Sequence, residues 1–307
     1  MPAIHIERSI DINKKIDEVY KSLLDFNDWL YWSPWLIMEK EAKTVVSEDG
    51  RYYEWKGDRI GEGNMTIERE EENKTIDYDL TFLKPWKSKA KVRFKLVENK
   101  NHTNIVWMMD SSLPFFMFWM KKSMEAYVGM DYERGLRLLK DFLEKGKIDS
   151  TIKVLGEYEF SETNYVGLRS LCDIDELSTN MGNDFGTLEE FKKNYPDVKT
   201  EKTFTIYEKW DIKKKQAAYI ACLSVDRVPL DLDSKFITGN IPSTKIFTLR
   251  HTGSYKHLGN AWATMMNFEQ SKKITSNKKI YPFEHYVSDP REVKEKDLIT
   301  DVIFAIK

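Results

Sequence analysis

The sequence predicts an α+β protein with two domains: a curved antiparallel sheet closed by a long helix, then a duplicated β-α-β-β unit. In the first half, runs of alternating apolar and polar residues follow one another with only turn residues between them. A long helix-spaced apolar series ends that half, and the second half then repeats one order of elements. A length of 307 residues also fits about two domains. We expect them at residues 1–148 and 155–307.

The first elements are a strand and a short helix. Residues 3–12 alternate as a half-buried strand does, and apolar residues at helical spacing follow between Ile16 and Leu24. Pro34 ends this helical pattern in a segment that brings three tryptophans together. Successive antiparallel strands, separated by Gly, Asn and Asp turn signals, are then predicted at residues 52–55, 63–67, 74–82, 90–97 and 103–109.

The first half closes with a long amphipathic helix of about six turns. Its apolar face consists of Met124, Val128, Tyr132, Leu136, Leu139 and Leu143, and Gly146 is the expected C-cap. The apolar run 113–120 precedes it and is much shorter than the ~20 residues that span a bilayer. Three interpretations of this run stay open: a cavity lid, a partner surface, or the buried start of the helix.

The second half contains two copies of one unit. In the first copy, strand 165–171 leads to a helix opened by a capping box at Thr187, then to strands 203–211 and 217–225. In the second, strand 245–251 leads to a helix capped by Ser254, then to strands 281–287 and 300–306. An internal similarity aligns residues 206–209 with 282–285 and so aligns Glu208 with Glu284. Two such units side by side form a pseudo-twofold sheet whose central groove is a default ligand site.

Composition narrows the function classes. A formal net charge of -2 gives no electrostatic case for nucleic-acid binding, whereas 13% aromatic residues, including nine Trp, supply material for cores and cavity walls. Cys172 and Cys222 have no partner at metal-site spacing, so we expect buried free thiols and neither a metal nor a cofactor. The first residues lack the pattern of a secretory signal. We therefore expect a cytoplasmic protein with no membrane partner.

Glu284 is the most informative residue, because it lies in the aromatic-rich run IYPFEHYVSDP at residues 280–290. Burying a carboxylate is costly unless a cation, a hydrogen-bond donor or a proton compensates it. Glu284 is therefore either a solvent-facing strand residue or the polar anchor of an aromatic-walled pocket. Tyr286, two residues later, lies on the same face of the strand. We interpret His251 and His257 as surface or capping residues.

The first half resembles a known superfamily in element order and in short motifs. The motifs are WLYWSPW at residues 29–35, after the first helix, and YEWKG at 53–57, before GEG at 61–63. Over residues 3–145 the chain resembles the START-like, polyketide cyclase-type (SRPBCC) helix-grip superfamily. The resemblance implies a hydrophobic cavity between sheet and long helix. No spacing of acids and histidines in this half suggests a catalytic pair.

The second half resembles another family. The motifs are RHTGSYKHL at residues 250–258, Trp262, and PFEHY at 282–286 followed by Asp289 and Pro290. Over residues 155–307 the chain is similar to the GyrI-like small-molecule-binding domain, also found as the effector-binding domain of AraC- and MerR-type regulators. The resemblance implies that Glu284 lies in a central pocket that takes cationic aromatic drugs, with Tyr255 and Trp262 as candidate walls. No helix-turn-helix precedes this domain, so DNA binding by that route is not expected.

Three function classes follow. The first is a small-molecule-binding protein that holds an apolar or cationic aromatic ligand for sensing or sequestration, with Glu284, Tyr255, Trp262, Tyr286 and Glu208 as ligand-binding residues. The second, implied by some GyrI-like relatives, is a hydrolase of reactive, DNA-alkylating compounds. In it Glu284 acts as general base with a raised pKa and Glu208 is the second carboxylate. The third is an interaction protein, such as one that binds a topoisomerase. The sequence names neither the ligand nor the oligomeric state.

Overall fold

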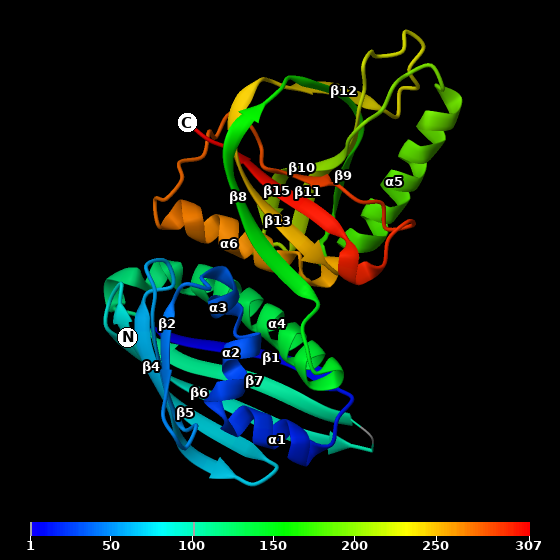
Figure 1. Ribbon diagram of the computed structural model, residues 1–307. Helices are drawn as coiled ribbons and strands as arrows, with labels where there is room; N and C mark the ends of the chain where they lie inside the picture. Colours follow the sequence, from blue (N-terminus) through cyan, green and yellow to red (C-terminus); the bar gives the residue numbers. More distant parts are fainter. Residues whose placement is uncertain (1, 101) are drawn as a thin grey trace. The chain divides into compact units, whose positions relative to one another are not determined.

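The computed structural model describes residues 2–100 and 102–307; Met1 and Asn101 lie outside the described residues. The chain divides into two compact units, Met1–Asp149 and Ser150–Lys307 (Figure 1). Each unit has its own antiparallel sheet, and a long helix follows the first sheet. The predicted α+β class is confirmed.

Across residues 2–100 and 102–149, seven strands form one sheet in the order β1-β7-β6-β5-β4-β3-β2. The elements are β1 (Ala3–Ile12), α1 (Ile16–Leu24), α2 (Phe26–Trp32), α3 (Pro34–Met38), β2 (Lys43–Val46), β3 (Tyr52–Lys56), β4 (Glu62–Glu71), β5 (Thr75–Lys84), β6 (Ser88–Asn99), β7 (His102–Ser112), η1 (Phe115–Met120) and α4 (Lys121–Lys145). The five strands predicted between residues 52 and 109 are present, and β2 is an additional one. Pro34 is the first residue of α3, where its missing N–H costs nothing.

Aromatic rings fill the space between this sheet and α4. Trp107 of β7 stacks on Tyr132 of α4, with ring centroids 3.8 Å apart and planes at 16°. Trp29 and Trp32, from α2, meet Trp107 edge to face. The resemblance implied a hydrophobic cavity in this region, and at these positions the rings pack against one another. Gly146, with φ of 71°, ends α4 as expected.

The apolar run before α4 is exposed. It forms the 3₁₀ helix η1, and its side chains are 77% (Phe115), 76% (Phe116), 61% (Phe118) and 69% (Trp119) exposed. The interpretation of residues 113–120 as a buried helix start is therefore wrong for these four rings. Only the methionines of η1, Met117 and Met120, pack against the core.

Across residues 150–307, eight strands form one sheet in the order β12-β9-β11-β10-β14-β15-β13-β8. The elements are β8 (Ser150–Phe160), β9 (Thr163–Asp173), η2 (Ile174–Glu176), α5 (Leu177–Asn194), β10 (Thr203–Asp211), β11 (Gln216–Ser224), β12 (Ile237–Ile241), β13 (Thr244–Gly253), η3 (Tyr255–His257), α6 (Gly259–Gln270), β14 (Phe283–Tyr286), η4 (Glu295–Asp297) and β15 (Ile299–Ala305). The predicted duplication is confirmed, and each copy has one additional strand before its β-α-β-β unit. Each added strand pairs with the other copy. Strand β8, before the first copy, pairs with β13 of the second, and β12, before the second copy, pairs with β9 of the first.

The two copies meet at the central strands β10 and β14. Thr205 pairs directly with Glu284, and the backbone N–H of Tyr207 donates to the carbonyl of Pro282, mirroring the pairing of Thr203 with Tyr286. The pseudo-twofold axis therefore passes through the Thr205–Glu284 pair. The predicted equivalence of Glu208 and Glu284 is wrong, and Thr205 occupies that position. Glu208 lies three residues further along β10, at a β-bulge between Tyr207 and Lys209, and has no partner in the regular register with β11.

Two further local predictions are corrected. Helix α5 begins at Leu177, so Thr187 lies inside the helix, where its hydroxyl donates to the carbonyl of Asn183 rather than opening a capping box. His251 and His257 are buried rather than at the surface. His251 Nε2 lies 3.0 Å from the hydroxyl oxygen of Ser150, and burial together with His257 lowers the pKa of His251 to about 4.

Other local predictions hold. The hydroxyl of Ser254 accepts a hydrogen bond from the backbone N–H of Lys256, and so caps η3 just before α6. Cys172 and Cys222 are buried free thiols, as predicted. No helix of the described residues combines the length and the apolar character needed to cross a bilayer.

Candidate functional site

Glu284 lies in the middle of the second unit, on the central strand β14. Its residue surface is 2% exposed, so the interpretation of Glu284 as a solvent-facing strand residue is wrong. Because side chains alternate along a strand, Glu284 and Tyr286 share one face, which also carries Thr205 and Tyr207 of β10.

Three ring donors satisfy the carboxylate. The hydroxyl of Tyr286 donates to Oε2 at 2.9 Å, and the hydroxyl of Tyr207 donates to the same oxygen at 3.1 Å. Nε1 of Trp262 donates to Oε1. Thr205 supports the arrangement, since its Oγ1 lies 3.0 Å from the Tyr286 hydroxyl. All of these donors are neutral.

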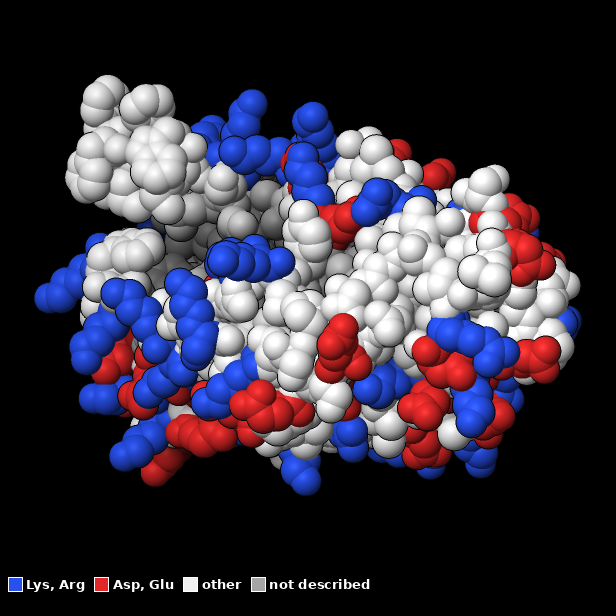
Figure 2. Space-filling view, turned by 90° about the horizontal axis from the view of Figure 1, so that it is seen from above, with Lys and Arg blue, Asp and Glu red and all other residues white. Residues whose placement is uncertain are grey.

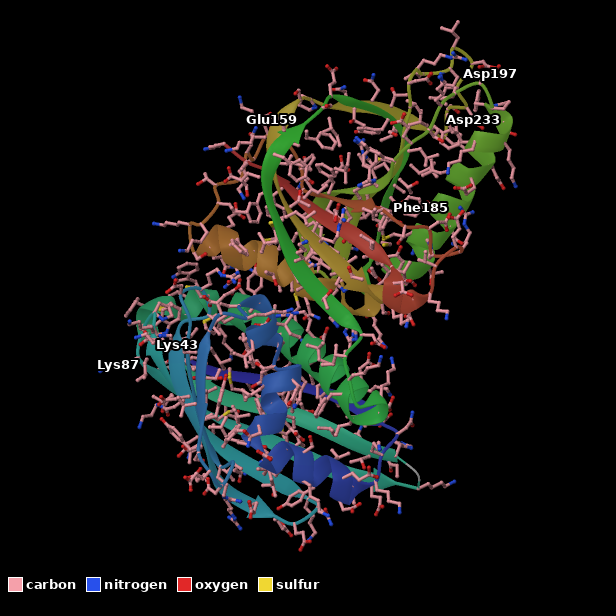
Figure 3. The ribbon with its side chains drawn as sticks, viewed as in Figure 1. Lys43, Lys87, Glu159, Phe185, Asp197 and Asp233 are labelled. Carbon is pink, nitrogen blue, oxygen red and sulfur yellow. The ribbon has the colours of Figure 1, made fainter. Side chains whose placement is uncertain are left out.

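Both helices contribute rings to this cluster. Trp262, from α6, meets Tyr207 edge to face with ring centroids 5.1 Å apart. Phe185, labelled on α5 in Figure 3, meets Tyr286 in the same way at 5.4 Å. Tyr255 of η3 lies 6.0 Å from Tyr286, centroid to centroid, and is 38% exposed. Tyr255 therefore lies at the rim of the cluster, between the buried rings and solvent.

Burial dominates the electrostatics of the site. Loss of water raises the pKa of Glu284, and the hydrogen bonds from Trp262, Tyr286 and Tyr207 only partly oppose this rise. Burial and the nearby Glu284 charge also raise the pKa values of both tyrosines, which therefore remain protonated donors. Burial, followed by the charge of Glu284, raises the pKa of Tyr255 to about 12. Within the described residues, no Lys or Arg forms an ion pair with Glu284.

Glu208 does not join this cluster. Its carboxylate pairs with Arg169 of β9, two strands away in the sheet, with Oε1 and Nη2 3.0 Å apart. Phe204 and Ile206, which alternate with Thr205 and Tyr207, pack in a separate core on the other side of the sheet. The structure thus brings together four of the five predicted binding residues and leaves Glu208 out.

A different carboxylate lies on the helix-covered face. Asp184 of α5 accepts hydrogen bonds from the Tyr219 hydroxyl at 2.7 Å and from the Ser170 hydroxyl at 2.8 Å. Tyr219 is the cross-strand neighbour of Tyr207, so two tyrosines connect Asp184 to Glu284. Asp184, Tyr207 and Phe185 are not among the residues predicted from the sequence. For Tyr207 a signal existed, because strict alternation along residues 203–207 places it on one face with Thr205.

The remaining surface offers less specific features. In the first unit, a hollow of about 300 Å³ is lined on the sheet by polar residues, among them Asp79, Lys91 and Asp110. Lys91 pairs with Asp79 there, so these charges neutralise each other. Basic and acidic side chains are interspersed on the face shown in Figure 2. Among the residues described, no group of three or more His, Cys, Asp or Glu side chains is arranged to hold a metal ion.

Comparisons with known families agree with this division of the chain. Residues 158–307 match the family described as the GyrI-like small molecule binding domain. Residues 3–144 match the family described as polyketide cyclase / dehydrase and lipid transport. Comparison with curated proteins gives no match.

Several solved structures are similar to the chain. The EcmrR–DNA complex in EcmrR-RPo, determined by cryo-EM, is 18% identical over 62% of this chain and 69% of that chain, with a TM-score of 0.45. Protein MLL2253 from Mesorhizobium loti is 16% identical over 48% of this chain and 100% of that chain, with a TM-score of 0.35. The Aha1 dimer from Colwellia psychrerythraea is 18% identical over 47% of this chain and 99% of that chain, with a TM-score of 0.36. These likenesses concern the fold alone.

Proposed function

Because the chain is a fusion of a polyketide cyclase-type domain and a GyrI-like small-molecule-binding domain, we propose that its second unit binds a cationic aromatic small molecule at Glu284. The protein binds this molecule in order to sense it or to sequester it. We place the protein in the cytoplasm, where a reducing environment suits two free thiols.

One observation carries this proposal: Glu284 is a buried carboxylate that only neutral groups compensate. Its three partners are a tryptophan N–H and two tyrosine hydroxyls. A buried charge without a counter-ion is costly, and a ligand cation removes part of that cost when it binds. The surrounding rings add cation–π attraction and flat apolar area.

The position of Tyr255 at the rim of the cluster supports entry of the ligand past this residue. Tyr255 is partly exposed and contacts Tyr286, which in turn donates to Glu284. A ligand ring that displaces or stacks on Tyr255 reaches Tyr286 next, and its cationic group then shares the carboxylate with the resident donors. Asp184 gives the same face a second negative charge, held by Ser170 and Tyr219.

The test is a binding titration with cationic aromatic compounds. Ethidium and tetraphenylphosphonium are titrated into wild type and into Glu284→Gln, with the anionic dye fluorescein as ligand control. We expect the cations to bind wild type and Glu284→Gln to bind them about a hundredfold more weakly, because a buried charge partner is lost. Without ligand, Glu284→Gln should be at least as stable as wild type above the ordinary carboxyl pKa, since it removes a buried charge whose pKa burial raises.

The matched control is Glu208→Gln, which removes a carboxylate from a strand of the same sheet. It should leave dye affinity unchanged, because Glu208 pairs with Arg169 away from the cluster. Equal dye affinity in wild type and Glu284→Gln would show that Glu284 is not the anchor.

Hydrolysis is a second candidate, supported by the raised pKa of Glu284. A general base works best when its pKa lies near the operating pH, and burial moves a carboxyl group in that direction. Glu208 cannot be the second carboxylate in this geometry, and Asp184 takes its place as candidate. Mass spectrometry of the incubated ligand separates the two functions. A ligand recovered with unchanged mass supports binding alone. A ligand that gains the mass of one water with wild type, but not with Glu284→Gln, supports hydrolysis.

A further inference from the structure

The first unit carries a cluster of exposed aromatic side chains on one short segment. We call residues 115–119 the aromatic turn; three phenylalanines and a tryptophan of this turn are mostly exposed. Met117 and Met120 anchor the segment by packing on the core beneath it. Four large rings held outward on one short 3₁₀ helix form an exposed apolar patch of the kind that marks an interaction site.

A second loop places more apolar surface at the same end of the sheet. We use the name β5–β6 turn for residues 83–88, the turn together with the strand ends that flank it; this segment exposes Leu83 and Trp86. It lies beside the end of β7, because the Ser111 hydroxyl donates to the carbonyl of Lys89 and Ala90 pairs with Ser111. The aromatic turn follows β7 directly, so both loops project from this end.

The two segments that carry these rings are rich in lysine, in contrast to the chain as a whole. Segments 83–89 and 113–122 contain five lysines and no Asp or Glu, whereas the whole chain has a net charge of -2. Lys84 pairs with Glu62, and Lys121 lies near Glu125. The other three, Lys87, Lys89 and Lys122, form no ion pair within the described residues. Figure 3 shows Lys87 pointing outward at the margin of the first unit.

We infer that the aromatic turn and the β5–β6 turn together dock the first unit onto an anionic lipid surface. Tryptophan and phenylalanine insert at the boundary between headgroups and acyl chains, while lysines are attracted by the negative surface potential. The lysines favour a membrane over a protein partner, because protein–protein interface cores are enriched in aromatics but depleted in lysine. This docking is peripheral and independent of Glu284. It departs from the expectation of no membrane partner without requiring a spanning helix.

Vesicle co-sedimentation of the full chain tests the inference. We expect binding to vesicles of phosphatidylcholine and phosphatidylglycerol in equal parts, weak binding to phosphatidylcholine alone, and loss of binding as salt rises. Lys87→Glu/Lys89→Glu/Lys122→Glu should lower partitioning by on the order of a hundredfold or more, since each lysine near the surface contributes about fivefold. Phe115→Ser/Phe118→Ser/Trp119→Ser should abolish it. Lys213→Glu/Lys214→Glu and Leu171→Ser, exposed positions in the second unit, are the matched controls and should bind as wild type.

A site-specific dye gives an independent measurement. Since Cys172 and Cys222 are buried, a cysteine introduced as Phe116→Cys can be labelled selectively with an environment-sensitive fluorophore. Its emission should shift to the blue on the anionic vesicles, and the label at Leu171→Cys should not shift. The proposal is overturned if wild type fails to bind the anionic vesicles or if the aromatic variant binds as well as wild type. It is also overturned if the aromatic substitutions leave vesicle binding unchanged and alter only the molecular mass that the free protein shows in sedimentation. That result would make the surface a protein interface.

Discussion

Glu284 is a buried charge held by hydrogen bonds alone. A hydrogen bond to a charged group contributes about 1.5–3 kcal/mol, so three of them can balance much of the cost of removing one carboxylate from water. The donors come from three separate elements: Trp262 from α6, Tyr207 from β10 and Tyr286 from β14 itself. The ionised state of Glu284 therefore depends on each donor being in place.

Removing one donor tests this dependence. Tyr207→Phe keeps the ring contact with Trp262 but leaves Oε2 of Glu284 with one donor fewer. We expect the free energy of unfolding at neutral pH to fall by about 1–3 kcal/mol, and the pKa of Glu284 to rise further. Urea denaturation measures the first effect, with Tyr158→Phe on the half-exposed β8 as control. An unchanged stability would mean that the third hydrogen bond contributes nothing to holding the charge.

His251 makes the second unit sensitive to acid. Burial, with a smaller contribution from His257, lowers its pKa from 6.5 to about 4 in the folded state. Between these two values the unfolded chain binds a proton that the folded protein does not, so stability present above 6.5 is lost as the pH falls toward 4. At about 1.4 kcal/mol per pKa unit, the loss amounts to about 3 kcal/mol.

Urea denaturation between about pH 7 and pH 4 measures this loss. His251→Gln should flatten the pH dependence of stability, although it can lower stability at every pH by disturbing the contact with Ser150. His102→Gln, in the first unit, should leave the slope unchanged. A wild-type slope retained in His251→Gln would assign the acid sensitivity to another group.

At the scale of elements, the two long helices each contain a glycine, buried at Gly135 of α4 and exposed at Gly186 of α5. A Cβ added at Gly135 of α4 would lie 2.8 Å from a ring carbon of Trp107 and 3.1 Å from Pro34. A Cβ at Gly186 of α5 would meet nothing within 4 Å. Glycine is thus required at one helix position for packing, and at the other it only adds flexibility to the unfolded chain.

The same substitution should therefore have opposite effects in the two helices. Gly135→Ala should destabilise the first unit by about 1–3 kcal/mol through overpacking against Trp107. Gly186→Ala should stabilise the second unit by about 0.4–1 kcal/mol, because alanine restricts the unfolded chain and favours the helix. Thermal unfolding of both variants decides this; a stabilising Gly135→Ala would show that Trp107 moves aside at little cost.

At the scale of the whole molecule, we propose that the two units fold independently of each other. The boundary between them lies between residues 149 and 150. Strand β8 begins at Ser150, between the domain bounds expected from the sequence, residues 148 and 155. Its first five residues, 150–154, pair with residues 249–253 of β13, and Ser150 contacts the buried His251. A boundary at residue 155 therefore cuts through a paired strand.

Two polypeptides test this division. Residues 150–307 should unfold cooperatively when produced alone, whereas residues 155–307 should be less stable by about 2 kcal/mol or more, because one end of β13 loses its neighbour and His251 becomes exposed. Circular dichroism during urea denaturation compares the two. Equal stability would place the start of the folding unit after residue 154.

Much of the fold could be predicted because the spacing of apolar residues along the chain indicates the type and position of most strands and helices. Alternation in residues 3–12 and helical spacing from Met124 to Leu143 gave β1 and the core of α4, since buried faces repeat with the period of the element. The short strands β2 and β12 carry weaker patterns, and α5 begins without a side-chain cap, so their presence or limits were missed. Exposure could not be predicted for residues 113–120: an apolar run of Phe, Met and Trp fits a cavity lid, a partner surface or a buried helix start, and in the structure the rings of η1 face outward.

The sequence by itself determined the two-unit organisation, the duplication in the second unit, and Glu284 as the residue to examine. Only the tertiary structure decided which groups surround that carboxylate. Tyr207 lies 77 positions and Trp262 22 positions from Glu284 along the chain, and their contacts depend on strand pairing and helix packing rather than on local spacing. Glu208 is excluded from the cluster because it follows Tyr207 directly on β10, where side chains alternate between faces, and its carboxylate pairs with Arg169.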